Sequence, residues 1–292
     1  MVLPLLLQVT VAVVQPGAVL AIRLPEGKEV TRWALPAPPV TLAVAPDGAL
    51  WVPIRNGAAT LVLRPEGGVE EVAGRLVPLF FRETDRFFTL FPGELAVLSY
   101  PELVRLDQWS LPANLAVVHA AVLDDGWAVA LLAAGAEPQV ILVFPFDEGK
   151  LISLPLTGLR GGKKVALSRS FLAVAGEGGV GLWPLGPAEG VRLPVEGVVV
   201  DLLWSADGEE LFLLVANPKS VLLRVKCSGK LAKLPKPKAF WRGVGEPKAL
   251  AASGAGLLVL EAERVTWVDR RGTVVGQAAV RQGLFLALLP SR

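Results

Sequence analysis

The sequence contains one histidine, His119, and one cysteine, Cys227, among its 292 residues. A single cysteine excludes an internal disulfide, and one residue of each kind nearly excludes a zinc site, which takes three or four such ligands. A Ser–His–acid or Cys–His nucleophile would have to use these same two side chains, and no Gly-x-Ser-x-Gly motif occurs. The sequence therefore predicts no metal site, no cofactor and no catalytic residue.

Charge is also scarce, since only 19% of the residues are charged and the net charge is +2. This total makes nucleic acid an improbable partner, because phosphate backbones are recognised by strongly basic surfaces. Hydrophobic residues make up 52% of the chain, which argues against disorder and suits strands that are buried on both faces. Many prolines and few thermolabile residues suggest a thermophilic source.

Residues 1–22 carry no charged side chain, which raises the question of a signal peptide or a membrane span. A signal peptide needs a basic segment before its apolar run, and none is present. A spanning helix would have to accommodate Gln8, Gln15 and the Pro16-Gly17 pair. We expect two strands instead, LLLQVTVAVV and AVLAIRL, joined by a Gln-Pro-Gly turn, in a cytoplasmic protein without a membrane span.

Asp-Gly turns recur between short apolar segments, separated by 78 and 82 residues. Weaker copies of the same pattern follow each of them, which gives a period of about 40 residues. A repeat of this length that holds four short strands predicts a β-propeller. The clear turns are Asp47-Gly48, Asp125-Gly126 and Asp207-Gly208, and the weaker copies are Asp85-Arg86, Arg169-Ser170 and Ser253-Gly254.

The repeats predict an all-β, seven-bladed propeller that forms a single domain over residues 1–292. Residues 281–290 resemble a lone first strand, and residues 1–36 supply three strands without one. Pairing the two ends completes a seventh blade and removes an open sheet edge; six or eight blades are the alternatives. The other six units are expected at about 40–77, 78–115, 116–162, 163–197, 198–245 and 246–280.

The repeats resemble WD-type, NHL and "SPDG" propeller repeats. The resemblance is carried by Ala45-Pro46-Asp47-Gly48 and by Trp204-Ser205-Ala206-Asp207-Gly208, while the Trp-Asp and Gly-His marks of true WD repeats are missing. It implies the propeller fold and no particular family function. Proteins with such repeats are mostly interaction platforms, with some hydrolases and lactonases among them, so fold analogy alone bears weakly on function.

Six tryptophans occupy recurring places in the repeats, and we expect them to pack one blade against the next, because a tryptophan buries a large apolar area. Trp241 differs, since it lies in a long basic connection with Arg242. We interpret it as a hydrophobic plug, and the alternative is that it grips an anionic or planar ligand. The recurring ones are Trp51 and Trp127 in second strands, Trp183 and Trp267 in third strands, and Trp33 and Trp109 in fourth strands.

A polar column appears when the residue about six places before each turn is aligned across the units. This position opens the first strand of each blade, and we expect it to line the mouth of the central channel. A water-filled channel needs polar side chains in any case, so the column is not by itself a ligand site. Its members are Thr41, Leu79, His119, Lys164, Asp201, Lys248 and Gln282.

Connections on the same side are richer in basic than in acidic residues, which predicts a basic entrance face that attracts acidic partners. The basic residues are Arg55, Arg160, Lys163, Lys219, Lys236, Lys238 and Arg242, and the acids are Glu137, Glu177, Glu246 and Glu261.

Two functions follow. The first is a non-enzymatic scaffold that binds an acidic protein or peptide. The second is a small-molecule enzyme, either a lactonase-like hydrolase or a sugar dehydrogenase, with Asp201 and His119 as acid–base candidates; the shortage of carboxylates weighs against it. The predicted binding residues are His119, Lys164, Asp201, Lys248, Gln282, Trp241 and Arg242.

Overall fold

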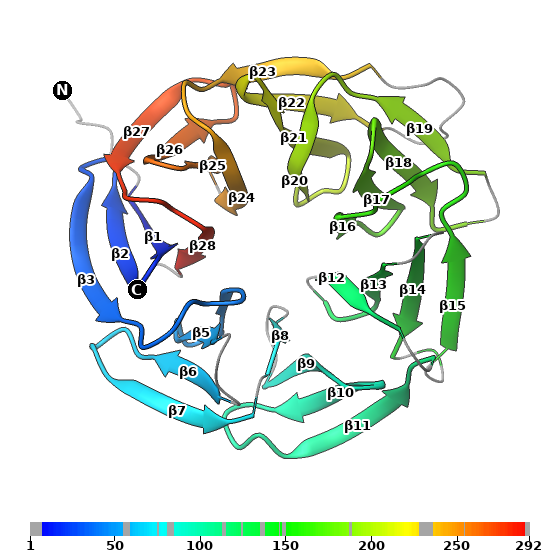
Figure 1. Cartoon of the computed structure of the whole chain (residues 1–292), viewed down its shortest axis with the longest axis horizontal. Coiled ribbons are helices and arrows are strands. Elements are labelled where there is room, and N and C mark those ends of the chain that lie inside the picture. The colour runs from blue at the N-terminus through cyan, green and yellow to red at the C-terminus, as the bar shows by residue number, and fades with distance from the viewer. Residues whose placement is uncertain are drawn as a thin grey trace. The chain divides into compact units, whose positions relative to one another are not determined.

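Seven sheets, each of four antiparallel strands, make up the computed structural model, and they are arranged as the blades of a β-propeller (Figure 1). No helix occurs in the part of the chain that the structure describes. The predicted all-β, seven-bladed fold is thus confirmed. The described residues are 8–54, 59–74, 76–80, 85–112, 115–123, 125–134, 138–145, 147, 150–186, 189–227, 236–253 and 255–289.

The strands belong to two compact units, Met1–Leu76 with Phe240–Arg292, and Val77–Ala239. In the first unit, the last strand of the chain pairs with the first, with Val14 opposite Phe285 and Thr10 opposite Leu289. This is the predicted closure of the two chain ends, and the Pro16-Gly17 turn joins two strands as expected. The sheet contains, in order, β28 (Phe285–Leu289), β1 (Val9–Gln15), β2 (Ala18–Leu24) and β3 (Lys28–Ala34).

Two further sheets complete this unit. One contains β4 (Ala43–Val44), β5 (Leu50–Pro53), β6 (Ala59–Leu63) and β7 (Val69–Ala73). The other contains β24 (Pro247–Ser253), β25 (Gly256–Glu261), β26 (Arg264–Asp269) and β27 (Val274–Ala279).

The second unit holds three whole sheets and most of a fourth, whose last strand runs on to Arg242. Each follows the predicted repeat boundaries. The strands are β8 (Pro78–Phe80), β9 (Arg86–Phe91), β10 (Glu94–Ser99) and β11 (Arg105–Ser110); β12 (Val117–Val122), β13 (Val129–Ala133), β14 (Gln139–Phe144) and β15 (Lys150–Pro155); β16 (Lys164–Leu167), β17 (Phe171–Gly176), β18 (Gly179–Pro184) and β19 (Val191–Pro194); and β20 (Val198–Trp204), β21 (Glu210–Asn217), β22 (Lys219–Lys226) and β23 (Lys238–Arg242).

The three Asp-Gly turns share one geometry. In each, the aspartate Oδ1 accepts a hydrogen bond from the backbone N–H two residues later, at 2.9–3.0 Å. The glycine adopts a positive φ of 70–85°, a conformation that costs other residues energy. The repeated sequence signal is therefore a repeated backbone requirement for turns between first and second strands, at Gly48, Gly126 and Gly208.

The core lies mainly along the second and third strands of the blades. Every residue of β13 and β25 is buried, whereas the fourth strands β7 and β11 are largely exposed. Burial on both faces explains why the second and third strands are mainly apolar instead of alternating. Polar side chains are therefore confined mostly to the turns, the outer strands and the strand ends.

Two of the tryptophan predictions have different outcomes. Trp51 lies within β5 and is only 2% exposed, as expected of a residue packed between blades. Trp127 is 43% exposed, so its predicted burial is wrong. It directly follows the Gly126 turn and precedes β13, and its indole forms a T-shaped contact with the ring of Phe144, with ring centroids 5.0 Å apart.

Replacing Trp51 by Ala should lower the free energy of unfolding by about 3–5 kcal/mol, because it empties a large buried site. Trp127→Ala is the matched control and should cost about 1 kcal/mol, since it removes one aromatic contact at a half-exposed position. Chemical denaturation of both variants measures the two values. Equal losses in the two variants would contradict the assignment of Trp51 to a core between blades.

Candidate functional site

Three of the predicted site residues come together on neighbouring first strands in the unit Val77–Ala239. These residues are His119 on β12, Lys164 at the start of β16 and Asp201 in the middle of β20. The strands β12, β16 and β20 are consecutive neighbours in this unit (Figure 1). We call these three residues the inner-strand cluster.

A β-bulge precedes two of the three side chains. Val118 has no partner between the pairs Val117–Ala133 and His119–Leu132, and Val200 has none at the same place in β20, just before Asp201. Bulges change the direction of the strand locally and so redirect the side chains beside them. The polar residues are therefore presented at points where the regular alternation of the strand is broken.

A third bulge corrects the predicted column. In β24 the pairing passes from Pro247 to Ala249, so Lys248 is the unpaired residue. The position that corresponds to His119 and Asp201 is therefore held by Ala249. Lys248 instead forms an ion pair with Glu246, with 2.6 Å between Nζ and Oε1. Counting residues back from the turn failed here because Ala249 stands only four places before Ser253, whereas His119 and Asp201 stand six places before the aspartates of their turns.

The imidazole of His119 is held in one tautomer. The backbone N–H of Val165 donates to its Nδ1 at 3.3 Å, so the ring carries its proton on Nε2 when neutral. Burial of the ring, and next the positive charge of Lys164, lower the pKa of His119 to about 3. The ring is therefore neutral near pH 7, and no described residue accepts a hydrogen bond from Nε2.

Lys164 and Asp201 form an ion pair beside this ring. The distance from Nζ to Oδ1 is 3.6 Å, longer than a direct charge-assisted hydrogen bond. The same Oδ1 accepts a hydrogen bond from the backbone N–H of Leu202 at 3.1 Å. The lysine side chain is 32% exposed and that of Asp201 14%, so the ammonium is open to a competing anion while the carboxylate is mostly covered.

Two exposed aliphatic side chains lie close in sequence to residues of the cluster. Val118 is 48% exposed and Val198, at the start of β20, is 57% exposed. Sequence reasoning missed both, because a strand pattern read as regular gives no reason to expose them. Partly buried polar groups beside exposed aliphatic groups form a surface that suits a ligand with both characters.

The other predicted residues belong to the unit that contains Phe240–Arg292, and the structure does not add them to the cluster. Trp241 lies within the fourth strand β23 and is buried, in agreement with the plug interpretation, although it was expected in a connection. Arg242 and Gln282 are exposed, and Gln282 has a φ of 50°.

One acid assigned to the entrance face has a structural role instead. Glu261 is buried, and its Oε1 accepts a hydrogen bond from the backbone N–H of Gly245 at 2.7 Å. It thus supports the turn before β24. Arg55 and Glu137, also assigned to that face, lie outside the described residues.

The cluster contains one carboxylate and one imidazole, too few for a protein metal site. Across the described ranges, no group of three His, Cys, Asp or Glu side chains is placed to hold a metal ion. These ranges also contain no helix long and apolar enough to cross a membrane. The chemistry open to the cluster is hydrogen bonding and charge pairing by one ammonium, one N–H and one carboxylate.

No protein-family model and no curated protein sequence matches the chain. Among solved structures, it is similar to a functionally unknown protein from Desulfotomaculum acetoxidans, with a TM-score of 0.70 and 13% identity over 97% of this chain and 99% of that one. It also resembles the periplasmic gluconolactonase PpgL of Pseudomonas aeruginosa, with a TM-score of 0.67 and 18% identity over 98% and 100% of the two chains. A third similar structure is AztD of Citrobacter koseri, with a TM-score of 0.66 and 10% identity over 97% of both. Identities this low show the propeller fold alone.

The low pKa of His119 should make stability depend on pH. In the unfolded chain the ring binds a proton near its ordinary pKa of 6.5, while in the folded protein it stays neutral down to about pH 3. The contribution of the neutral ring to the free energy of unfolding is complete above pH 6.5. It falls as the pH drops towards 3, because the unfolded state binds more protons than the folded state in this range. From pH 6.5 to pH 5, the wild type should lose about 1–2 kcal/mol more than His119→Asn.

Urea denaturation at pH 7, 6 and 5 measures this difference. Asparagine is the suitable replacement because its Oδ1 can still accept the hydrogen bond from Val165 while it does not titrate. Parallel pH profiles for the wild type and the variant would show that the imidazole titrates alike in both states, and so contradict its neutral, buried character.

Proposed function

We propose that this chain is a binding module that holds acidic peptide segments at the inner-strand cluster. The observation that supports this most is the pairing of two hydrogen-bond donors, His119 Nε2–H and Lys164 Nζ, on adjacent strands. Both are donors at neutral pH, because the ring is neutral with its proton on Nε2 and the ammonium is positive. Together they would donate hydrogen bonds to one carboxylate of a ligand.

The loose ion pair explains how such a carboxylate could enter. Lys164 is separated from Asp201 by 3.6 Å, so its ammonium can turn towards an incoming anion without losing a short hydrogen bond. Asp201 keeps its bond to the Leu202 N–H and holds the lysine in place before the ligand arrives. A hydrogen bond to a charged group contributes about 1.5–3 kcal/mol. Removing the lysine ammonium should therefore weaken the affinity for the peptide by about 10–100-fold.

The exposed valines add a second recognition element. Val118 and Val198 lie close in sequence to His119 and Asp201 and offer aliphatic surface. Burial of such surface is favourable, while an acidic segment without apolar side chains would leave it in water. The preferred ligand is therefore a segment in which an Asp or Glu stands next to an aliphatic residue.

The alternative is a lactonase-like hydrolase, and the gluconolactonase PpgL among the similar structures favours it. In that case Asp201 would act as a base towards water or a lactone. His119 is poorly suited to acid–base work, because a pKa of about 3 makes it a weak base at neutral pH. The ion pair between Asp201 and Lys164 is also more consistent with binding than with proton transfer.

The test uses a peptide array in which each acidic–aliphatic peptide has a partner with Glu and Asp replaced by Gln and Asn. Wild-type protein should select acidic peptides, and Lys164→Met should weaken the selected interactions by about 10–100-fold. Lys28→Met, at an exposed position of β3 in the other unit, is the charge-matched control and should leave binding unchanged.

The proposal would be overturned if the wild type bound acidic and amide peptides equally. It would also be overturned if Lys164→Met bound the acidic peptides as tightly as the wild type does. Hydrolysis of gluconolactone that is lost in Asp201→Asn would instead establish the lactonase alternative. The thermal midpoints of Lys164→Met and Asp201→Asn are measured as well. An unchanged midpoint shows that a variant is folded, so that its loss of binding or activity reports on the site.

A further inference from the structure

The small net charge of the chain hides a strongly basic segment. Residues 211–245 contain eight lysines and arginines and no aspartate or glutamate, so this segment carries a charge of +8. Since the whole chain is +2, the remaining residues together carry −6. Such segregation within 35 residues is not expected of a surface that only needs to be soluble, where both signs are mixed.

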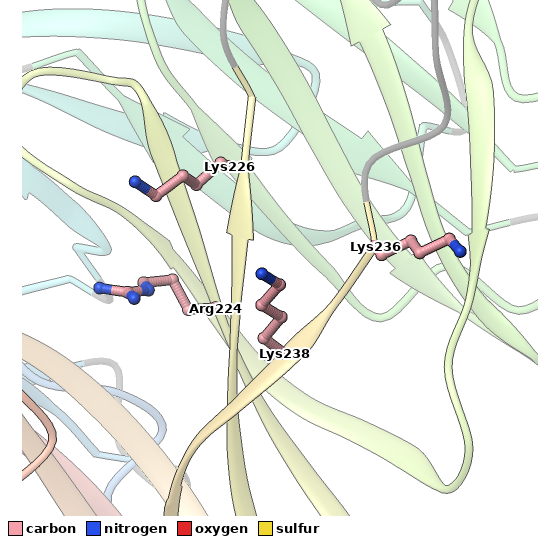
Figure 2. A pocket seen from close by; sticks show the side chains of 4 residues that line it. All are labelled: Arg224, Lys226, Lys236 and Lys238. Carbon is pink, nitrogen blue, oxygen red and sulfur yellow. The ribbon is translucent and has the colours of Figure 1, made fainter.

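Part of this segment forms a hollow of about 360 Å³, within the range of small-molecule sites. Four cationic side chains line it, Arg224 and Lys226 from β22, Lys238 from β23 and Lys236 just before it. Figure 2 shows Arg224 and Lys226 extending from β22 in the same direction, with Lys238 beside them, while the ammonium of Lys236 points away. We call these four residues the basic groove.

Carboxylates are sparse around the lysines of the groove. Glu210 lies 3.9 Å from both Arg224 Nη1 and Lys226 Nζ, too far for strong hydrogen bonds. Among the described residues, no carboxylate lies within 4.0 Å of the Nζ of Lys236 or Lys238. The four side chains carry four positive charges, and an entering anion would reduce their mutual repulsion.

We propose that the basic groove binds a compact anion with two or more linked phosphate groups. One phosphate carries about −1.5 to −2 at neutral pH, so a single phosphate leaves the groove uncompensated, whereas two or three linked phosphates balance it. Three of the four cations are lysines, which act as point charges towards phosphate, and the arginine adds a planar fork that matches phosphate oxygens.

The lining also sets limits on what is attached to the phosphates. None of the four side chains is aromatic, so a nucleobase would find no ring to stack on. An extended acidic peptide places successive side chains on opposite sides, about 7 Å apart along one side, and so presents fewer charges to a hollow of this size. The groove thus fits clustered phosphates better than carboxylates.

This site is separate from the inner-strand cluster. The basic groove is formed by the third and fourth strands of its blade, whereas His119, Lys164 and Asp201 lie on first strands. Loss of one site should therefore leave the other intact, and the peptide test above does not bear on this proposal.

Titration calorimetry with inorganic tripolyphosphate tests it. The double variant Lys226→Ala, Lys238→Ala should weaken binding at least about tenfold, because it removes two charged donors. Lys219→Ala changes an exposed lysine at the other end of β22 and should alter the affinity less than about twofold. Raising the salt concentration should weaken binding to the wild type more steeply than binding to the double variant.

Unchanged tripolyphosphate affinity in the double variant, at an unchanged thermal midpoint, would overturn the proposal. So would equal affinity for citrate, a tricarboxylate, because the groove would then respond to charge alone. A DNA duplex that binds much more tightly than tripolyphosphate, and is lost in the same double variant, would replace the small anion by a nucleic acid.

Discussion

Burial of the second and third strands on both faces is the constraint on which the other features depend. These strands have core on either side, so they hold almost only apolar residues, as β13 and β25 show. Their backbone groups are satisfied by neighbours in the same sheet, and the pairing of β1 with β28 extends this to the two ends of the chain. Functional polar groups are left with the first strands, the fourth strands, the turns and the ends of third strands, where Arg224 and Lys226 of β22 lie.

The inner-strand cluster follows from this constraint. First strands have only one sheet neighbour, and bulges before His119 and Asp201 interrupt their regular alternation. The ring of His119 is still buried enough to remain neutral, while the Lys164 ammonium stays partly in water. A neutral donor and a charged donor are thereby held together by backbone geometry, which suits recognition of a carboxylate better than proton transfer.

Much of the fold could be predicted because the Asp-Gly turns report a backbone requirement. A positive φ at Gly48, Gly126 and Gly208 favours glycine, and the aspartate before it caps the turn, so the period is visible in the sequence. The exact distance from turn to strand leaves no such mark, which is why Lys248 was aligned one residue out of register and Trp127, which lies between the turn and β13, was placed inside a strand. The basic groove was predicted only in part: Lys236 and Lys238 were assigned to connections on the entrance face, whereas Arg224 and Lys226 of β22 were not singled out, although the absence of acids from residue 211 to 245 was visible.

The neutral tautomer of His119 can be observed directly, because the chain contains no other histidine. A two-dimensional ¹⁵N–¹H correlation spectrum of the imidazole at pH 7 distinguishes a protonated ring nitrogen from an unprotonated one. An unprotonated Nδ1 and a protonated Nε2, unchanged down to pH 5, are the predicted result, since Val165 donates to Nδ1. Two protonated nitrogens near pH 6, or a proton on Nδ1, would contradict the donor arrangement on which the proposed carboxylate site depends.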